Sequence, residues 1–143
     1  TEHQHVTRQT ETFYGENRGN VYEFSHRMID AGADVIFGHG PHLLRATELY
    51  KDRLICYSLG NFATYARFSL SPPKHLAPIV EVFMKPDGTF LYAKVHNFVQ
   101  HGEGGPEADD KSQSYTQLKK LTESDFPETN LQFTGNNLIL RKP

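Results

Sequence analysis

The chain has 143 residues, of which 37% are hydrophobic and 22% charged, and its formal net charge is −2. This length suits one domain with a real core. Basic and acidic residues are scattered, which argues against a nucleic-acid groove or a patch for anionic membranes, and no run approaches the roughly 20 apolar residues of a membrane span. The single cysteine, Cys56, excludes an intrachain disulfide and lies in an apolar run, where we expect a small buried side chain.

The first part of the chain predicts a helix followed by a buried strand. Residues 1–17 are polar and aperiodic and indicate a loop. A helix is expected to begin near Asn17 or Asn20 and to end at Gly32. Its apolar face would be formed by Val21, Phe24, Met28 and Ile29. Residues 33–38 (ADVIFG) lack polar alternation, which predicts a strand buried on both faces, as in the centre of a parallel sheet. Helix, tight turn and strand make an α/β unit.

Two hairpins, a second helix and a last strand are predicted for the rest of the chain. Residues 46–60 favour a short hairpin around KDR, and residues 77–100 a clearer one around the Pro-Asp-Gly turn. Residues 102–112 (GEGGPEADDKS) indicate a flexible loop, and residues 112–124 a surface helix. Residues 131–141 read as a final strand or extended arm.

A histidine pair follows the predicted buried strand in DVIFGHGPHLLR. The carboxyl edge of an open α/β sheet is where ligands bind, and His39 and His42 would lie at that edge. Imidazole suits Zn, Fe, Mn or Ni, and Gly40 and Pro41 restrict the loop between the two rings. Alternatively, one ring hydrogen-bonds a backbone carbonyl and the other is exposed. Spacing alone leaves both alternatives open, because two histidines are half a metal site.

Two further polar residues near the pair have two readings each. Arg45 would contact an anion or phosphate beside the histidines, or be a surface arginine paired with Glu48 or Glu81. Asn61, after the second strand of the first hairpin, would line the site or hold its loop next to the histidines. Polar residues before the first helix would serve the site or the helix N-terminus; they are Glu11, Glu16 and Arg18.

The stretch GADVIFGHGPHLLRATELYKDRLICYSLGNF resembles the C-terminal signature of bacterial capsule-synthesis proteins of the CapA/PgsA type, which are associated with poly-γ-glutamate. The resemblance is dense over about residues 15–65. The matching pieces are Ala31-Gly32-Ala33-Asp34, Gly38-His39-x-Pro41-His42, Glu48-Leu49-Tyr50-Lys51 and Tyr57-Ser58-Leu59-Gly60-Asn61-Phe62. Together these pieces are far more specific than the histidine pair.

This resemblance implies an α/β fold: the C-terminal half of a four-layer α/β/β/α metallophosphoesterase-like sandwich around two divalent metal ions. His39 and His42 would then be metal ligands, the ions Mn, Fe or Zn, and the chemistry a phosphoesterase-like hydrolysis. The other ligand motifs of that superfamily are absent from this sequence. We therefore expect residues 1–143 to be one partial domain from the C-terminal portion of a longer protein, with weak or no stoichiometric metal and no turnover alone.

The resemblance also implies a role in capsule or poly-γ-glutamate biosynthesis, with a membrane synthesis complex or an envelope polymer as partner and no nucleic acid. The alternative is a non-catalytic accessory or scaffold protein of such a complex. An extracytoplasmic location, membrane-associated through a segment outside this chain, is expected, with a cytoplasmic location as the alternative. A separated half-sandwich would expose sheet edges, so the chain is expected to self-associate.

Overall fold

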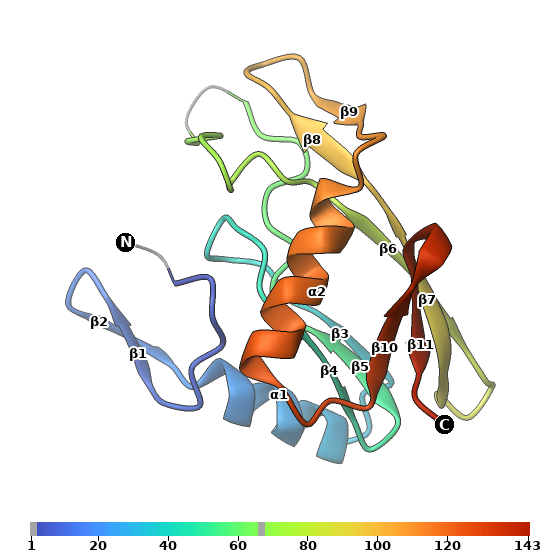
Figure 1. Ribbon diagram of the computed structural model, residues 1–143. Helices are drawn as coiled ribbons and strands as arrows, with labels where there is room; N and C mark the ends of the chain where they lie inside the picture. Colours follow the sequence, from blue (N-terminus) through green and yellow to red (C-terminus); the bar gives the residue numbers. More distant parts are fainter. Residues whose placement is uncertain (1–2, 66–67) are drawn as a thin grey trace.

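A computed structural model describes residues 3–65 and 68–143, and it has a mixed α/β fold built from short strands and two α-helices (Figure 1). The elements are, in chain order, β1 (Glu11–Phe13), β2 (Glu16–Gly19), α1 (Val21–Asp30), β3 (Val35–Phe37), β4 (Thr47–Tyr50), β5 (Arg53–Cys56), β6 (Ile79–Met84), β7 (Phe90–His96), β8 (Phe98–Gln100), β9 (Pro106–Ala108), α2 (Gln113–Asp125), β10 (Leu131–Thr134), the short 3₁₀ helix η1 (Gly135–Asn137) and β11 (Leu138–Arg141).

Helix α1 begins where its cap predicts. The Asn20 side chain accepts a hydrogen bond from the Glu23 backbone N–H at 2.9 Å, and the chain leaves the helix at Ala31 and Gly32. The predicted apolar face is wrong in part, because Phe24 and Met28 are 59% and 38% exposed. Ile29 is buried as expected, so the helix packs through a neighbouring, more polar face.

Strands β3, β5 and β4 form one sheet, in that order. Strand β3 pairs with β5 in parallel, and β4 with β5 as the predicted hairpin. The expectation that β3 is buried on both faces is wrong, because β3 is an edge strand and Phe37 is 46% exposed. The central strand is β5, where Leu54, Ile55 and Cys56 are all 0% exposed. Within the described residues β3 has no strand on its other side; the expected self-association stays a prediction.

A second sheet has the strand order β10-β11-β7-β6, and the β6–β7 hairpin confirms the Pro-Asp-Gly turn. The tail is two strands in a hairpin around η1, where the sequence predicted a single one. Helix α2 buries Leu118 and Leu121, as its spacing predicts, and the Thr122 hydroxyl accepts from the backbone N–H of Thr47 in β4 at 3.0 Å. The core therefore joins both sheets and both helices.

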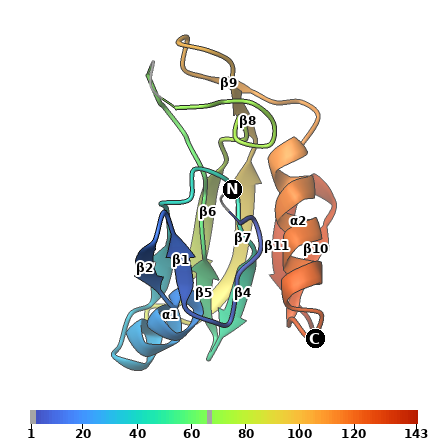
Figure 2. The same ribbon diagram turned by 90° about the vertical axis from the view of Figure 1, so that its left-hand side faces the viewer.

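Two small hairpins lie in segments predicted to be loops. Strands β1 and β2 pair within residues 11–19, and β9 pairs with β8 inside the predicted flexible loop. Figure 2 shows α1 and the β1–β2 hairpin on one side and α2 on the other, with β4, β5, β6 and β7 between them. This confirms the expected α/β class, with sheets between helices.

In the two described ranges, no helix has the length and apolar character needed to cross a membrane.

Candidate functional site

The candidate site is built on two loops that run side by side after β3 and β5. The backbone N–H of Gly38 donates to the Cys56 carbonyl at 2.7 Å, and that of Leu59 donates to the Gly38 carbonyl at 3.0 Å. Further along, the N–H of Arg45 donates to the Ser58 carbonyl at 3.0 Å. The first two bonds extend the parallel β3–β5 pairing beyond the strands, and the third extends the antiparallel β4–β5 pairing, so the loop that carries the histidines lies against a fixed neighbour.

Glycine is required at position 38 by the closeness of the two chains. A Cβ built on Gly38 would lie 2.3 Å from the Tyr57 carbonyl oxygen and 3.0 Å from that of Cys56. Both contacts are to backbone, which cannot swing aside as a side chain can. Backbone packing therefore explains the glycine of the Gly38-His39 pair, independently of any ligand.

Each histidine of the pair is held through its Nδ1 atom. His39 Nδ1 lies 3.2 Å from the Gly60 carbonyl oxygen, and His42 Nδ1 lies 2.9 Å from Asn61 Oδ1. His42 has a φ of +57°, a left-handed conformation that is uncommon outside glycine. Asn61 stabilises it from the other side as well, because Asn61 Nδ2 donates to the His42 carbonyl at 3.1 Å. The two loops thus fix both rings and one strained backbone position.

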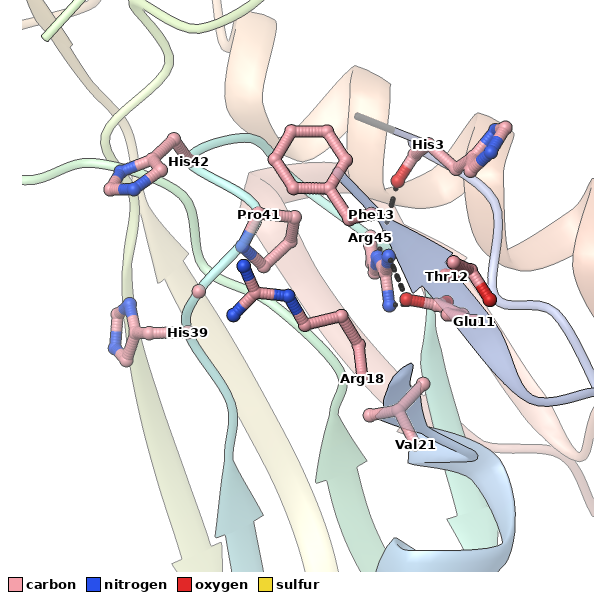
Figure 3. A pocket seen from close by; sticks show the side chains of 11 residues that line it. His3, Glu11, Thr12, Phe13, Arg18, Val21, His39, Pro41, His42 and Arg45 are labelled. Atoms are coloured by element: carbon pink, nitrogen blue, oxygen red, sulfur yellow. Dashed lines mark hydrogen bonds and ion pairs between the residues drawn. The ribbon is translucent and has the colours of Figure 1, made fainter. Parts of the chain in front are cut away.

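Both histidines line a cavity of about 420 Å³ between their loop and the β1–β2 hairpin (Figure 3). The hairpin contributes Glu11, Thr12, Phe13 and Arg18, and the chain before it His3. Asn61 is 4% exposed and does not line this cavity; it supports His42 from behind. The second sequence alternative for Asn61, holding the loop beside the histidines, is therefore the one that describes its contacts.

Arg45 also lines the cavity, but its guanidinium is already paired. It is 5% exposed and lies 2.9 and 3.0 Å from the two carboxylate oxygens of Glu11. Its Nε donates to the His3 carbonyl at 3.2 Å. The predicted surface position and pairing with Glu48 or Glu81 are wrong, because Arg45 is buried and its partner is Glu11. The pair ties the β1–β2 hairpin to the histidine loop.

Arg18 is the cavity arginine whose charge is accessible. It forms an ion pair with Glu16 at 2.9 Å, but the two side chains are 51% and 69% exposed. Exposed pairs of this kind contribute at most about 1 kcal/mol, so they exchange readily for another anion. In Figure 3 the Arg18 side chain extends along Pro41, toward the side where the histidines lie.

Glu48 lies outside the cavity, in a second polar cluster with His26 and Tyr57. His26 Nε2 lies 2.9 Å from Glu48 Oε2, and the Tyr57 hydroxyl donates to the same oxygen at 2.6 Å. Burial, followed by the bond to Glu48, raises the pKa of Tyr57 above its usual range. Burial also raises the pKa of the nearby Cys56 thiol to about 12, as the predicted buried side chain requires. This cluster joins α1 to the first sheet.

His39 and His42 are the candidate metal ligands of this cavity. Two imidazoles held through Nδ1 are a common arrangement for metal-binding histidines. However, no group of three or more His, Cys, Asp or Glu side chains suited to a metal occurs in residues 3–65 and 68–143. A complete centre would need ligands from outside these residues.

The sequence pattern thus points to the histidine loop but not to most of the opposite wall of the cavity. It leaves open whether Glu11 and Arg18 serve the site or the helix, and it gives no sign that His3 and Phe13 line the cavity. Glu11 and Arg45 are 34 positions apart. No local pattern predicts such a contact.

Comparison with known proteins agrees with the resemblance seen in the sequence. The family described as "Bacterial capsule synthesis protein PGA_cap" matches residues 10–66. That segment contains both histidines, Arg45, Asn61 and the β1–β2 hairpin. It therefore includes the walls of the cavity except for His3.

Three relatives illustrate the similarity. "Capsule biosynthesis protein CapA" of Bacillus anthracis is 38% identical over 97 residues, which cover 66% of this chain and 23% of the relative. "PGA biosynthesis protein CapA" of Bacillus subtilis is 31% identical over 100 residues, 70% of this chain and 26% of the relative. A protein of Mycobacterium tuberculosis described as a probable polyglutamine synthesis accessory protein is 45% identical over 48 residues, 34% of this chain and 12% of the relative. The chain thus spans about a quarter of the length of the two CapA relatives.

Proposed function

Since residues 10–66 belong to the bacterial capsule synthesis family, we propose that this chain serves capsule or poly-γ-glutamate biosynthesis through a divalent metal held by His39 and His42. One observation carries the proposal. The segment that matches the family contains both histidines, and both line the same cavity with their rings fixed through Nδ1.

In the proposed site, His39 and His42 bind Mn, Fe or Zn as neutral imidazoles. A metal in such a site supplies a Lewis acid and an activated water for hydrolysis. The loop bonds from Gly60 and Asn61 orient the two rings, and the Glu11–Arg45 pair fixes the wall that faces them.

The charge of the cavity supports an anionic substrate group. Glu11 is the carboxylate of its lining, and that charge is already matched by Arg45. Of the other side chains in the lining, Arg18 carries a formal positive charge. A carboxylate of a γ-glutamyl polymer or a phosphoryl oxygen would replace Glu16 on the exposed Arg18, because a guanidinium binds both kinds of oxyanion with parallel hydrogen bonds.

The second candidate function is a non-catalytic accessory or scaffold of a polymer-synthesis complex. Two observations favour it: residues 3–65 and 68–143 contain no group of three or more side chains suited to a metal, and one relative is itself described as a probable accessory protein. In that case the cavity would bind the anionic polymer or a partner's acidic segment without hydrolysis, and the complex would supply the chemistry.

The two candidates are separated in a capsule-producing bacterium that lacks its own CapA-type protein. The protein carrying this chain is supplied as wild type, as His39→Ala/His42→Ala, or with His96→Ala as control, since His96 lies outside the cavity and pairs with Glu81. The metal-dependent function predicts that the double variant loses both its bound metal and polymer production. Polymer production at the wild-type level in the double variant would contradict it and favour the accessory function. No polymer even with the wild-type protein would contradict both.

A further inference from the structure

The hydrogen bonds around Asn61 determine which way its amide group faces. Asn61 Nδ2 lies 3.1 Å from the His42 carbonyl oxygen and 3.3 Å from the Lys74 carbonyl oxygen. Carbonyl oxygens accept hydrogen bonds and cannot donate them, so the NH₂ end of the amide must face these two atoms. The oxygen and nitrogen of an Asn amide are usually assigned from their hydrogen-bond partners. Here the two carbonyl partners allow one orientation only.

This orientation also determines the proton on His42. With its NH₂ group turned to the two carbonyls, Asn61 directs Oδ1 to His42 Nδ1 at 2.9 Å. An amide oxygen only accepts, so His42 Nδ1 must carry the hydrogen. The same reasoning applies to His39, whose Nδ1 faces the Gly60 carbonyl at 3.2 Å.

We infer that Asn61 and the Gly60 carbonyl hold His42 and His39 as the Nδ1–H tautomer, so that Nε2 of each ring is the atom that binds a cation. Among the described residues, neither Nε2 atom has a hydrogen-bond partner. Asn61 is thus a positioning residue that acts on the proposed ligand through its tautomer. The role of Asn61 in metal binding rests on the proposed function. The tautomer assignment does not depend on that proposal.

Gly60 is suited to this task by its backbone. It has a φ of +70°, and a Cβ at this position would lie 3.2 Å from the Leu76 carbonyl oxygen. A residue with a side chain would be strained here and would move the carbonyl away from His39. The Gly-Asn pair at positions 60–61 therefore supplies one acceptor to each histidine, a backbone oxygen to the first and a side-chain oxygen to the second.

Two other histidines provide opposite references in the same molecule. His26 and His96 face the carboxylates of Glu48 and Glu81 through Nε2, each at 2.9 Å. They should carry hydrogen on Nε2, whereas His39 and His42 should carry it on Nδ1. One spectrum therefore contains both expected patterns.

The test is a long-range ¹H–¹⁵N correlation spectrum of the ¹⁵N-labelled, metal-free chain, recorded at alkaline pH where the imidazoles are neutral. We expect Nδ1–H patterns for His39 and His42 and Nε2–H patterns for His26 and His96. An Nε2–H pattern for His42 in the wild-type chain would overturn the inference without any variant.

Variants of Asn61 test its action on His42. Asn61→Leu removes the acceptor, so His42 should become a mixture of tautomers while His39 keeps its pattern. Asn61→Asp keeps an acceptor for His42 Nδ1 but loses the two bonds to the His42 and Lys74 carbonyls, so the folded variant should show the Nδ1–H form at lower stability. A folded Asn61→Leu chain in which His42 stays purely Nδ1–H would contradict the assignment; if that variant does not fold, the wild-type and Asn61→Asp spectra still decide.

Zinc titration then connects the tautomer to the proposed function. Loss of an outer-shell partner typically weakens metal affinity by about 10–100-fold, and we expect this for Asn61→Leu with recovery in Asn61→Asp. Equal zinc affinity of wild type and Asn61→Leu would remove the positioning role. If the protein carrying this chain bound zinc equally well with and without His39→Ala/His42→Ala, the proposed function would be contradicted and the tautomer assignment would still stand.

Discussion

Replacing Gly38 by alanine tests whether the close approach of the two loops determines the position of the histidines. The new Cβ would lie 2.3 Å from the Tyr57 carbonyl oxygen, whereas ordinary contact begins at 3.4 Å, so the chains would have to separate by about 1.1 Å (3.4 − 2.3). That movement breaks or weakens the two backbone hydrogen bonds of Gly38, from its N–H to the Cys56 carbonyl at 2.7 Å and from the Leu59 N–H to its carbonyl at 3.0 Å.

The expected loss follows from these two effects. Each hydrogen bond contributes about 1 kcal/mol net, and overpacking costs about 1–3 kcal/mol. A smaller opposing gain of about 0.4–1 kcal/mol comes from the reduced flexibility of the unfolded chain. We expect Gly38→Ala to lower the free energy of unfolding by about 3 kcal/mol, measured by urea unfolding followed by circular dichroism.

Gly104→Ala is the matched control, because a Cβ on Gly104 meets nothing within 4 Å. It should leave the urea midpoint unchanged or slightly raised. A Gly38→Ala chain whose free energy of unfolding falls by less than about 1 kcal/mol would refute the packing argument, since the strain and the two weakened bonds together require more.

Three more predictions concern the ion pair, the thiol and the start of α2. Glu11→Ala leaves the Arg45 guanidinium buried without its carboxylate, so it should lower the free energy of unfolding in urea by about 3 kcal/mol. Glu16→Ala, whose partner Arg18 is exposed, should lower it by less than about 1 kcal/mol. Equal losses would contradict the buried pairing. Because burial raises the pKa of Cys56 to about 12, a thiol reagent should label the native chain far more slowly than the urea-unfolded chain at neutral pH, and equal labelling rates would disprove the burial. At Asp109, burial raises the pKa but is outweighed by hydrogen bonds from Gln113 and Lys111, so the pKa lies below its ordinary value of 3.8. The stabilisation from this lowered pKa is present above the ordinary pKa and is lost as pH falls through the lower folded value. Asp109→Asn should therefore destabilise the chain at neutral pH and match wild type in strong acid. An effect of Asp109→Asn that persists in strong acid would argue against the charge as its cause.

Local chemistry explains which elements the sequence predicts. The Asn20 cap begins α1 and Gly32 follows its end, as expected, because capping depends on residues within one helical turn. The Pro-Asp-Gly turn gives the β6–β7 hairpin for the same reason. The histidine loop is predictable for a similar reason, because a Gly-rich turn after an apolar strand is a short-range pattern.

The errors have tertiary causes. A short apolar run such as Val35–Phe37 has the same sequence whether it is central or at an edge, and here β5 occupies the centre. The polar β1–β2 hairpin has no clear strand pattern, and it is anchored by a salt bridge between Glu11 and Arg45. Its position completes the cavity, so the half of the site that the sequence missed depends on a contact between distant residues.

The central claim is that His39 and His42 bind a divalent metal together, and zinc titration of the purified chain by calorimetry tests it most directly. The account predicts weak zinc binding by the wild-type chain, equal binding by His96→Ala, and affinity at least about tenfold lower in His39→Ala/His42→Ala, since removing ligands costs no less than removing their outer-shell partners. Zinc affinity that is the same in the double variant as in the wild type would contradict the claim.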